Sequence, residues 1–225
     1  MASGRDLLSR PTYGMSQVDQ LLHLSHGTAR RWIDGYSRDD RDYAPVVRVA
    51  PTGDDLVTWG EFVEASLLSQ FRDSGVSIRK LRPVVDQLRA QYKTPYPLAT
   101  LRPFRQGKEM VMEIQKEIGL ERELLLVEIR TGQLMLTPKA QRFHDAVVWE
   151  TKKKVASSLR LDPSAKLVSV DPLIAFGQPA VRAVKTEILA SAFRAGDSVS
   201  ALAAGFDLRE DQVNDAIRYE LGKAA

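Results

Sequence analysis

Apolar residues recur at helical spacing near the start of the chain, in two short segments separated by a few residues. The first segment begins behind Ser16, a candidate N-cap with Asp19 three residues further on. The second lies between Ser25, another candidate cap, and Gly35, which is placed to end a helix. The two apolar stripes are Val18, Leu21 and Leu22, then Ala29, Trp32, Ile33 and Tyr36. Two such helices joined by about three residues predict a helix-turn-helix.

A β-hairpin is predicted directly after these helices. The runs Val46–Val49 and Leu56–Thr58 are rich in β-branched residues and flank a turn that contains Pro, Gly and Asp. A capping box then opens another helix, and a further helix follows Ser77. Pro83 lies inside the apolar stripe of that last helix, so we expect a kink or a late helix start. Together these elements predict a winged helix-turn-helix domain over residues 1–98.

The pattern of apolar and polar residues changes twice in the remainder of the chain. Residues 99–164 contain strand-like runs and a possible connecting helix. The expected strands are Met110–Ile114, Leu124–Ile129 and Leu134–Leu136, with Thr131-Gly132 as a turn between the last two. The expected helix is Gln141–Leu159. Residues 165–225 begin with an extended segment and continue as helices, one of them with Ser198 as its N-cap, and resemble a second helix-turn-helix in outline. The predicted fold class is α+β, mainly α, with a winged helix-turn-helix, a small strand-rich middle region and a C-terminal helical domain.

Composition narrows the functional classes. The 225 residues contain no cysteine, which excludes disulfides and thiolate metal sites. No apolar run approaches the ~18–20 residues that a membrane helix needs, and Met1–Thr12 is too polar to resemble a secretory signal. We therefore expect a cytoplasmic protein without a membrane association. The net charge of +3 is too small for binding to nucleic acid in bulk, so any such contact requires a local cluster.

The second helix of the pair offers such a cluster. With its apolar residues turned inward, the other face carries polar and basic side chains that could read base edges or contact phosphates. The candidates on the helix are His26, Thr28, Arg30 and Arg31, and candidates just beyond it are Arg38, Arg41 and Arg48. Spacing alone leaves another possibility open, because helix-turn-helix pairs also serve as protein-interaction modules.

Other motifs give little sign of catalysis. The chain lacks a phosphate-binding loop, a dinucleotide-binding glycine motif, a His-Glu-x-x-His helix and a nucleophile elbow. We expect no cofactor, no metal site and no enzymatic activity. The run Lys152-Lys153-Lys154 beside Trp149 is typical of a solvated helix face; an accessory phosphate contact is the alternative.

The segment over residues 1–98 resembles the MerR-like winged helix family. The matching residues are Tyr13-Gly14-Met15, the run Leu24-Ser25-His26-Gly27-Thr28-Ala29-Arg30-Arg31-Trp32-Ile33-Asp34-Gly35, and Leu56-Val57-Thr58-Trp59. This resemblance implies operator DNA as a partner, bound by the second helix in the major groove, and an assembly that is a homodimer or a hetero-oligomer.

The segment over residues 165–225 resembles a small antitoxin domain formerly catalogued as a domain of unknown function. The matching residues are Asp171-Pro172, Phe176-Gly177-Gln178-Pro179-Ala180-Val181-Arg182, Phe193-Arg194-Ala195-Gly196-Asp197-Ser198 and Gln212-Val213-Asn214-Asp215-Ala216-Ile217-Arg218-Tyr219-Glu220. The family usually continues after the arginine with Gly-Thr-Arg, whereas this chain has Ala183-Val184-Lys185.

The two domains in this order resemble a VapB-type antitoxin, whose partner is a PIN-domain ribonuclease toxin. The resemblance implies that residues 165–225 cover the toxin, whose acidic active site a basic side chain could block. Candidates for that contact are Arg182, Lys185, Arg218 and Lys223. The rival interpretations are a stand-alone MerR-like regulator controlled by a small effector, an adaptor that binds only protein, and, last, an enzyme.

Overall fold

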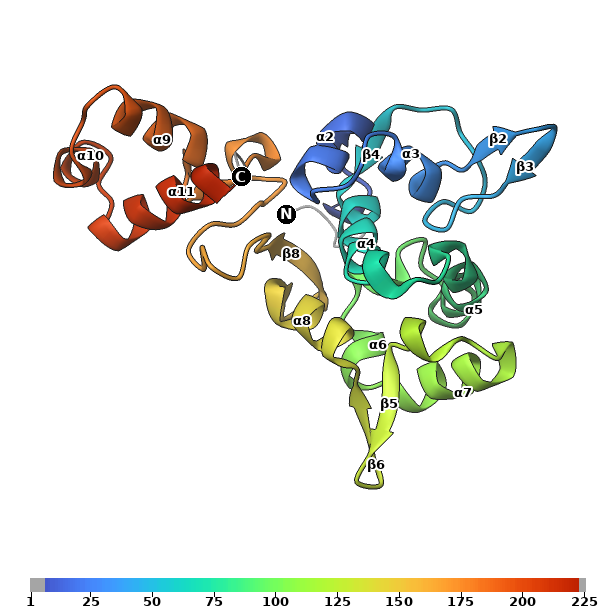
Figure 1. The fold of residues 1–225 in the computed structure, drawn as a ribbon. Coiled ribbons are helices and arrows are strands. Elements are labelled where there is room, and N and C mark those ends of the chain that lie inside the picture. Colours follow the sequence, from blue (N-terminus) through green and yellow to red (C-terminus); the bar gives the residue numbers. More distant parts are fainter. Residues whose placement is uncertain (1–6, 223–225) are drawn as a thin grey trace. The chain divides into compact units, whose positions relative to one another are not determined.

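The computed structural model describes residues 7–222 and has an α+β fold, in which short antiparallel strand pairs lie among helices that cover about half of the chain (Figure 1). It divides into two units. The N-terminal unit holds the chain up to Asp145 together with Trp149–Ala156, and the C-terminal unit holds Ala146–Val148 together with the chain from Ser157. The α+β class is confirmed. The winged helix-turn-helix, the strand-rich middle region and the C-terminal helical domain stay predictions, as does the division into residues 1–98, 99–164 and 165–225.

Helices dominate the chain up to residue 146. The elements in order are β1 (Pro11–Gly14), α2 (Met15–Leu21), α3 (Thr28–Ile33), β2 (Tyr36–Arg38), β3 (Arg41–Tyr43), β4 (Leu56–Thr58), α4 (Trp59–Ser69), η1 (Arg72–Ser74), η2 (Ile78–Leu81), α5 (Arg82–Tyr92), η3 (Pro97–Ala99), α6 (Arg102–Arg105), α7 (Lys108–Ile118), η4 (Arg122–Leu124), β5 (Val127–Arg130), β6 (Gln133–Leu136) and α8 (Pro138–Ala146), where η marks a single 3-10 turn.

Helix α4 forms the centre of the N-terminal unit. It is buried on every side, as expected for a helix that crosses a core, and even Glu61 and Glu64 are enclosed. The indole N–H of Trp59 donates to the carbonyl of Ala156 at 2.8 Å. The predicted capping box is confirmed, because the Thr58 hydroxyl accepts from the Glu61 N–H while the Glu61 carboxylate accepts from the Thr58 N–H.

The predicted hairpin over residues 46–58 is wrong. Strand β4 pairs with β1 instead, with Gly14 opposite Leu56. The run Val46–Val49 is not a strand, because the N–H groups of Val46 and Val47 both donate to the carbonyl of Trp32 and so satisfy the end of α3. The hairpin of this region is β2–β3, whose turn is formed by two aspartates with positive φ, at residues 39 and 40.

Two of the middle predictions are also wrong. Met110–Ile114 lies inside helix α7, which buries Val111, Ile114 and Gln115 at helical spacing and ends at Gly119, with a φ of 66°. The single helix expected over Gln141–Leu159 is instead the end of α8 followed by paired strands β7 (Val147–Glu150) and β8 (Val155–Leu159). Short apolar runs do not separate strand from buried helix, so sequence periodicity failed here.

Elsewhere the local signals hold. Strands β5 and β6 pair around the predicted turn at Thr131 and Gly132, although β5 begins three residues later than expected. Helix α5 starts at Arg82 with Pro83 in its first turn. Of the two alternatives expected at Pro83, the late helix start is therefore confirmed.

The C-terminal unit is a group of three helices with a small strand pair. Its elements are η5 (Ala175–Gly177), β9 (Ala180–Val181), β10 (Val184–Lys185), α9 (Thr186–Arg194), α10 (Val199–Gly205) and α11 (Glu210–Gly222). Ser198 caps α10 by accepting from the Ala201 N–H, as predicted. Leu189, Leu202, Val213 and Tyr219 lie in its core. In the described part of the chain, no helix combines the length and apolarity required to cross a bilayer.

Candidate functional sites

Helix α3 is held at its N-terminus by a residue of the preceding helix. The buried carboxylate of Asp19, in α2, accepts hydrogen bonds from the N–H groups of Gly27 and Ala29, each at 2.7 Å. Asp19 thus takes the place that the sequence assigned to Ser25, because a carboxylate satisfies the free amides and favours the positive end of the helix. This non-local cap fixes α3 against α2.

The outer side of α3 and the turn before it carry the predicted DNA-reading residues. His26 and Arg31 are exposed, and Thr28 is half-buried and accepts a hydrogen bond from the Arg31 guanidinium at 2.8 Å. Arg30 is 41% exposed and forms ion pairs with Asp34 and Asp55. The four side chains lie together on one short segment, and of its two arginines Arg31 has no ion pair with a carboxylate in the described chain.

Hairpin β2–β3 carries the next two candidates. Arg38 and Arg41 are directly opposite each other at its tip, and both are exposed. Arg38 forms an ion pair with Asp39, so the tip is charged but not uniformly basic. At the base, the rings of Tyr36 and Tyr43 stack at 4.6 Å. The hairpin therefore presents two arginines on a base that aromatic stacking stabilises.

Arg48 does not join this surface, which corrects its prediction as a phosphate contact. Its side chain is only 8% exposed and lies between two buried carboxylates, with Nη1 2.7 Å from Asp34 and Nε 2.8 Å from Glu61. Burial by itself would raise the pKa of Asp34, but hydrogen bonds from Thr52, Arg48 and Gly53 lower it below its ordinary value. Arg48 is a structural residue that joins the loop after α3 to the start of α4.

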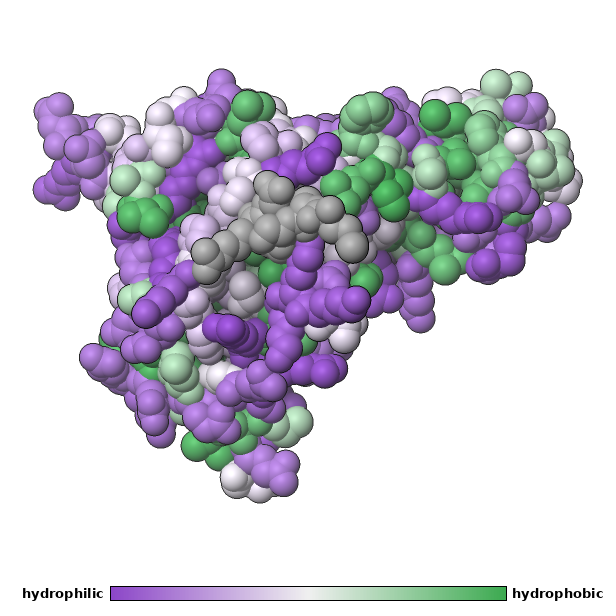
Figure 2. Space-filling model, turned by 180° about the vertical axis from the view of Figure 1, so that it is seen from behind, coloured by the Kyte–Doolittle hydropathy of each residue, from purple (hydrophilic) through white to green (hydrophobic). Residues whose placement is uncertain are grey.

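The C-terminal unit exposes an apolar segment that sequence reasoning missed as a surface. Phe176 is 85% exposed and Leu173 65% exposed, although both are large hydrophobic residues. Ala175 and Phe176 have positive φ, of 49° and 57°, which side chains other than glycine rarely adopt. Hydrophobic colour also gathers over this unit in Figure 2, on the face shown there. The signal in the sequence was the apolar run between Pro172 and Gly177 inside a turn.

The predicted toxin-contacting residues lie at three places. The Lys185 ammonium is 5.6 Å from the centre of the Phe176 ring, so a cation adjoins the exposed aromatic side chain. Arg182, with a φ of 54°, lies in the turn between β9 and β10 and donates to the carbonyl of Asp207. Arg218 forms an ion pair with Asp215 at 2.7 Å. Lys223 lies outside the described residues.

Comparison with known proteins places the chain among mycobacterial relatives. It is 36% identical over 227 residues to the uncharacterized protein Rv2308 of Mycobacterium tuberculosis, across 95% of this chain and 91% of that protein. The chain belongs to the same family as Rv2308. No protein-family model matches it.

Two further proteins of M. tuberculosis are similar to this chain. The putative antitoxin VapB45 of M. tuberculosis is 26% identical over 237 residues, across 96% of this chain and 98% of that protein. The crystal structure of Rv2018 from M. tuberculosis superimposes with a TM-score of 0.74 at 25% identity, covering 92% of this chain and 97% of that chain. Each of these similarities covers both units of the chain. The relatives therefore share both units in the same order.

Proposed function

We propose that this chain is the antitoxin of a type II toxin–antitoxin system and has no catalytic activity of its own. In this proposal the C-terminal unit binds and neutralises a PIN-domain ribonuclease toxin, and the N-terminal unit, as a MerR-like winged helix, binds promoter DNA and represses the operon. The observation that carries the proposal is the similarity to a putative antitoxin over 96% of the chain, which includes both the α2–α3 segment and the exposed Phe176 turn.

Affinity purification of the tagged protein from its native host tests the proposal as a whole. We expect a small PIN-domain protein to be retained in stoichiometric amount, and its ribonuclease activity to be inhibited when the complex is reconstituted. If only DNA is retained, the chain is a transcription regulator without a toxin partner. If neither DNA nor a ribonuclease is retained, both halves of the proposal fail.

Phe176 provides a sharper test of the toxin contact. Interfaces draw much of their affinity from a few aromatic anchors that become desolvated on binding. We expect Phe176→Ala to weaken toxin binding by roughly tenfold, or ~1–2 kcal/mol, without lowering the stability of the free protein, because the ring is already in solvent. Isothermal titration calorimetry with the purified toxin gives the affinity.

Ile129→Ala is the matched control, since Ile129 is 58% exposed but belongs to strand β5 of the other unit. It should leave toxin affinity unchanged. Equal losses in the two variants, or no loss in Phe176→Ala, would remove the 173–176 turn from the toxin interface.

The DNA contact is tested on α3. The double variant Arg30→Ala/Arg31→Ala should weaken binding to the promoter fragment by tenfold or more, because each lost base-edge pair costs ~1–3 kcal/mol. Each lost phosphate contact should also reduce the slope of log affinity against log salt by about one. Fluorescence anisotropy across a salt series measures both quantities.

The control removes two positive charges from exposed positions elsewhere in the same unit, with Lys116→Ala/Arg122→Ala. DNA binding that falls equally in both double variants would show an effect of net charge and would withdraw the role of α3.

A further inference from the structure

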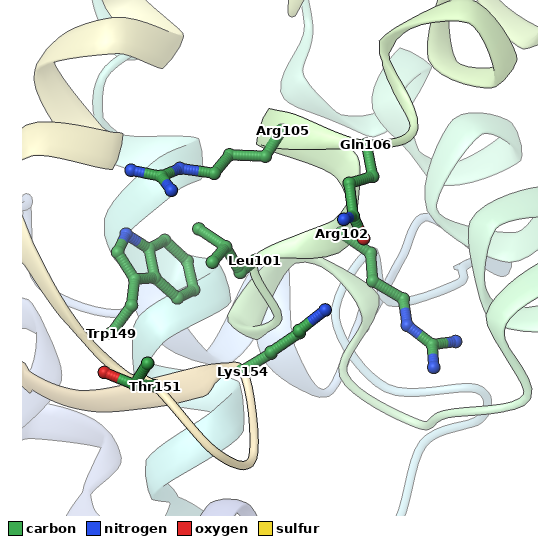
Figure 3. A pocket seen from close by; sticks show the side chains of 7 residues that line it. All are labelled: Leu101, Arg102, Arg105, Gln106, Trp149, Thr151 and Lys154. Carbon is green, nitrogen blue, oxygen red and sulfur yellow. The ribbon is translucent and has the colours of Figure 1, made fainter.

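A basic pocket lies in the N-terminal unit between the α6 segment and the β7–β8 hairpin (Figure 3). Its volume is about 390 Å³, within the size range of small-molecule sites. In Figure 3 the side chains of Gln106 and Lys154 enter from opposite sides, Arg105 extends toward Trp149, and the guanidinium of Arg102 points away from Trp149. The lining residues are Leu101, Arg102, Arg105, Gln106, Trp149, Thr151 and Lys154.

The charges of this pocket are uncompensated. Three of its lining residues are cationic, none is acidic, and within residues 7–222 no ion pair joins Arg102, Arg105 or Lys154 to a carboxylate. Arginines elsewhere in the unit behave differently: Arg48 and Arg89, for instance, both pair with acidic side chains. Like charges gathered at one cavity repel each other, so this arrangement favours binding of an anion.

The carboxylate of Glu150, which follows Trp149 in the sequence, already accepts hydrogen bonds from the backbone. Both carboxylate oxygens of Glu150 accept backbone N–H groups, from Lys152 at 3.1 Å and from Lys153 at 2.6 Å. The lysine run is therefore the turn of a hairpin and not the helix face that the sequence favoured. Lys154, with a φ of 56°, is the last residue of this turn and lines the pocket, whereas Lys152 does not line it.

One wall of the pocket is aromatic and rigid. The Trp149 indole packs against the rings of Phe104 at 5.7 Å, His144 at 5.9 Å and Phe143 at 6.4 Å, and its N–H donates to the carbonyl of His144. Leu101 completes the apolar part of the lining. A fixed indole beside cations suits a ligand that combines a flat ring with a phosphate.

We propose that this pocket binds a nucleoside phosphate. Arg105 and Lys154 contact the phosphate oxygens, since guanidinium and ammonium groups bind phosphate by charge-assisted hydrogen bonds. The Arg102 guanidinium lies over the Tyr92 ring, 6.0 Å from its centre, and adds positive charge at the edge of the pocket. Trp149 contacts the base, and the amide of Gln106 and the hydroxyl of Thr151 offer polar contacts to the sugar or base. A nucleotide unit within DNA has the same chemistry, but the volume of about 390 Å³ is that of a small-molecule site and favours the free nucleotide. This inference does not depend on the toxin or on the promoter.

Calorimetric titration of the full chain tests it with three probes: ADP, adenosine and pyrophosphate. ADP should bind one to one and more tightly than either fragment. Arg105→Gln and Lys154→Asn should each reduce ADP affinity by about tenfold, the effect of one lost charged hydrogen bond; asparagine suits the positive φ at position 154. Lys152→Gln, which removes a neighbouring charge outside the pocket, should leave ADP affinity unchanged.

Trp149→Phe separates the base from the phosphate contact, because phenylalanine keeps the aromatic packing. It should weaken ADP binding several-fold and leave pyrophosphate binding as it is. Equal affinity for adenosine and ADP, or unchanged ADP binding in Arg105→Gln and Lys154→Asn, would overturn the proposal. Pyrophosphate binding as tightly as ADP would reduce the site to an anion pocket. Loss of DNA binding in these variants, with no ADP binding to the parent, would assign the pocket to the nucleic-acid backbone and overturn it as well.

Discussion

Replacing Arg48 with methionine should destabilise the N-terminal unit by about 3–5 kcal/mol, the range for removing one partner of a buried ion pair. Asp34 and Glu61 would each keep a buried negative charge without its counter-charge. The carbonyl of Leu56 would also lose a hydrogen-bond donor, now 2.6 Å away. Denaturant unfolding monitored by circular dichroism, with linear extrapolation to water, gives the free energy of unfolding.

Two further variants test whether the lost counter-charge causes the loss of stability in Arg48→Met. Arg130→Met removes an exposed arginine that pairs with Glu128, and should cost less than ~1 kcal/mol. The triple variant Asp34→Asn/Arg48→Met/Glu61→Gln removes all three charges and should recover much of the loss, because glutamine still serves a capping box. An Arg48→Met protein as stable as Arg130→Met would show that the two carboxylates do not need this counter-charge.

The stability of the N-terminal unit should fall as pH rises from about 5 to 8. Burial raises the pKa of Glu64 to about 8, although the Arg89 charge and the Leu98 N–H both lower it. The unfolded chain therefore loses this proton near its ordinary pKa, while the folded chain retains it up to pH 8. Because the folded state holds more protons in this window, its stability decreases by up to ~1.4 kcal/mol per pH unit.

Glu64→Gln should flatten this slope, since glutamine does not titrate. The free energy of unfolding, measured at four pH values between 5 and 8, gives the slope for each protein. Glu117→Gln, an exposed position on α7, should keep the slope of the parent protein. Parallel slopes for the parent and Glu64→Gln would mean that Glu64 is ionised in the folded chain, with Arg89 as its partner 3.9 Å away.

Local signals in the sequence predicted local structure well. The Thr58 capping box, the Ser198 cap and the late helix start at Pro83 each depend on residues within one helical turn, and the structure confirms all three. The errors have a common cause in longer-range contacts. Asp19 looked like part of its own helix but caps the next one, and Val46 looked like a strand but terminates α3. No short window contains these partners.

The candidate sites show the same limit. The residues of α3 and of the turn before it are contiguous, so the sequence could bring His26, Thr28, Arg30 and Arg31 together. It could not reveal that Arg48 is buried, since the carboxylate of Glu61 lies 13 residues away. The basic pocket was equally hidden, because Arg105 and Lys154 meet across almost fifty residues of chain and only half of the cluster, the lysine run, was visible as a motif.

The cap that Asp19 provides has a consequence for anyone who wishes to move the α3 surface into another scaffold. With six residues, α3 is far shorter than the ~12–15 residues at which isolated helices begin to persist in water. It is a helix because Asp19 closes its beginning and the amides of Val46 and Val47 close its end. Residues 25–35 grafted alone would therefore not keep the helical conformation of α3. The smallest segment that carries both ends of this helix runs from α2 through residue 47.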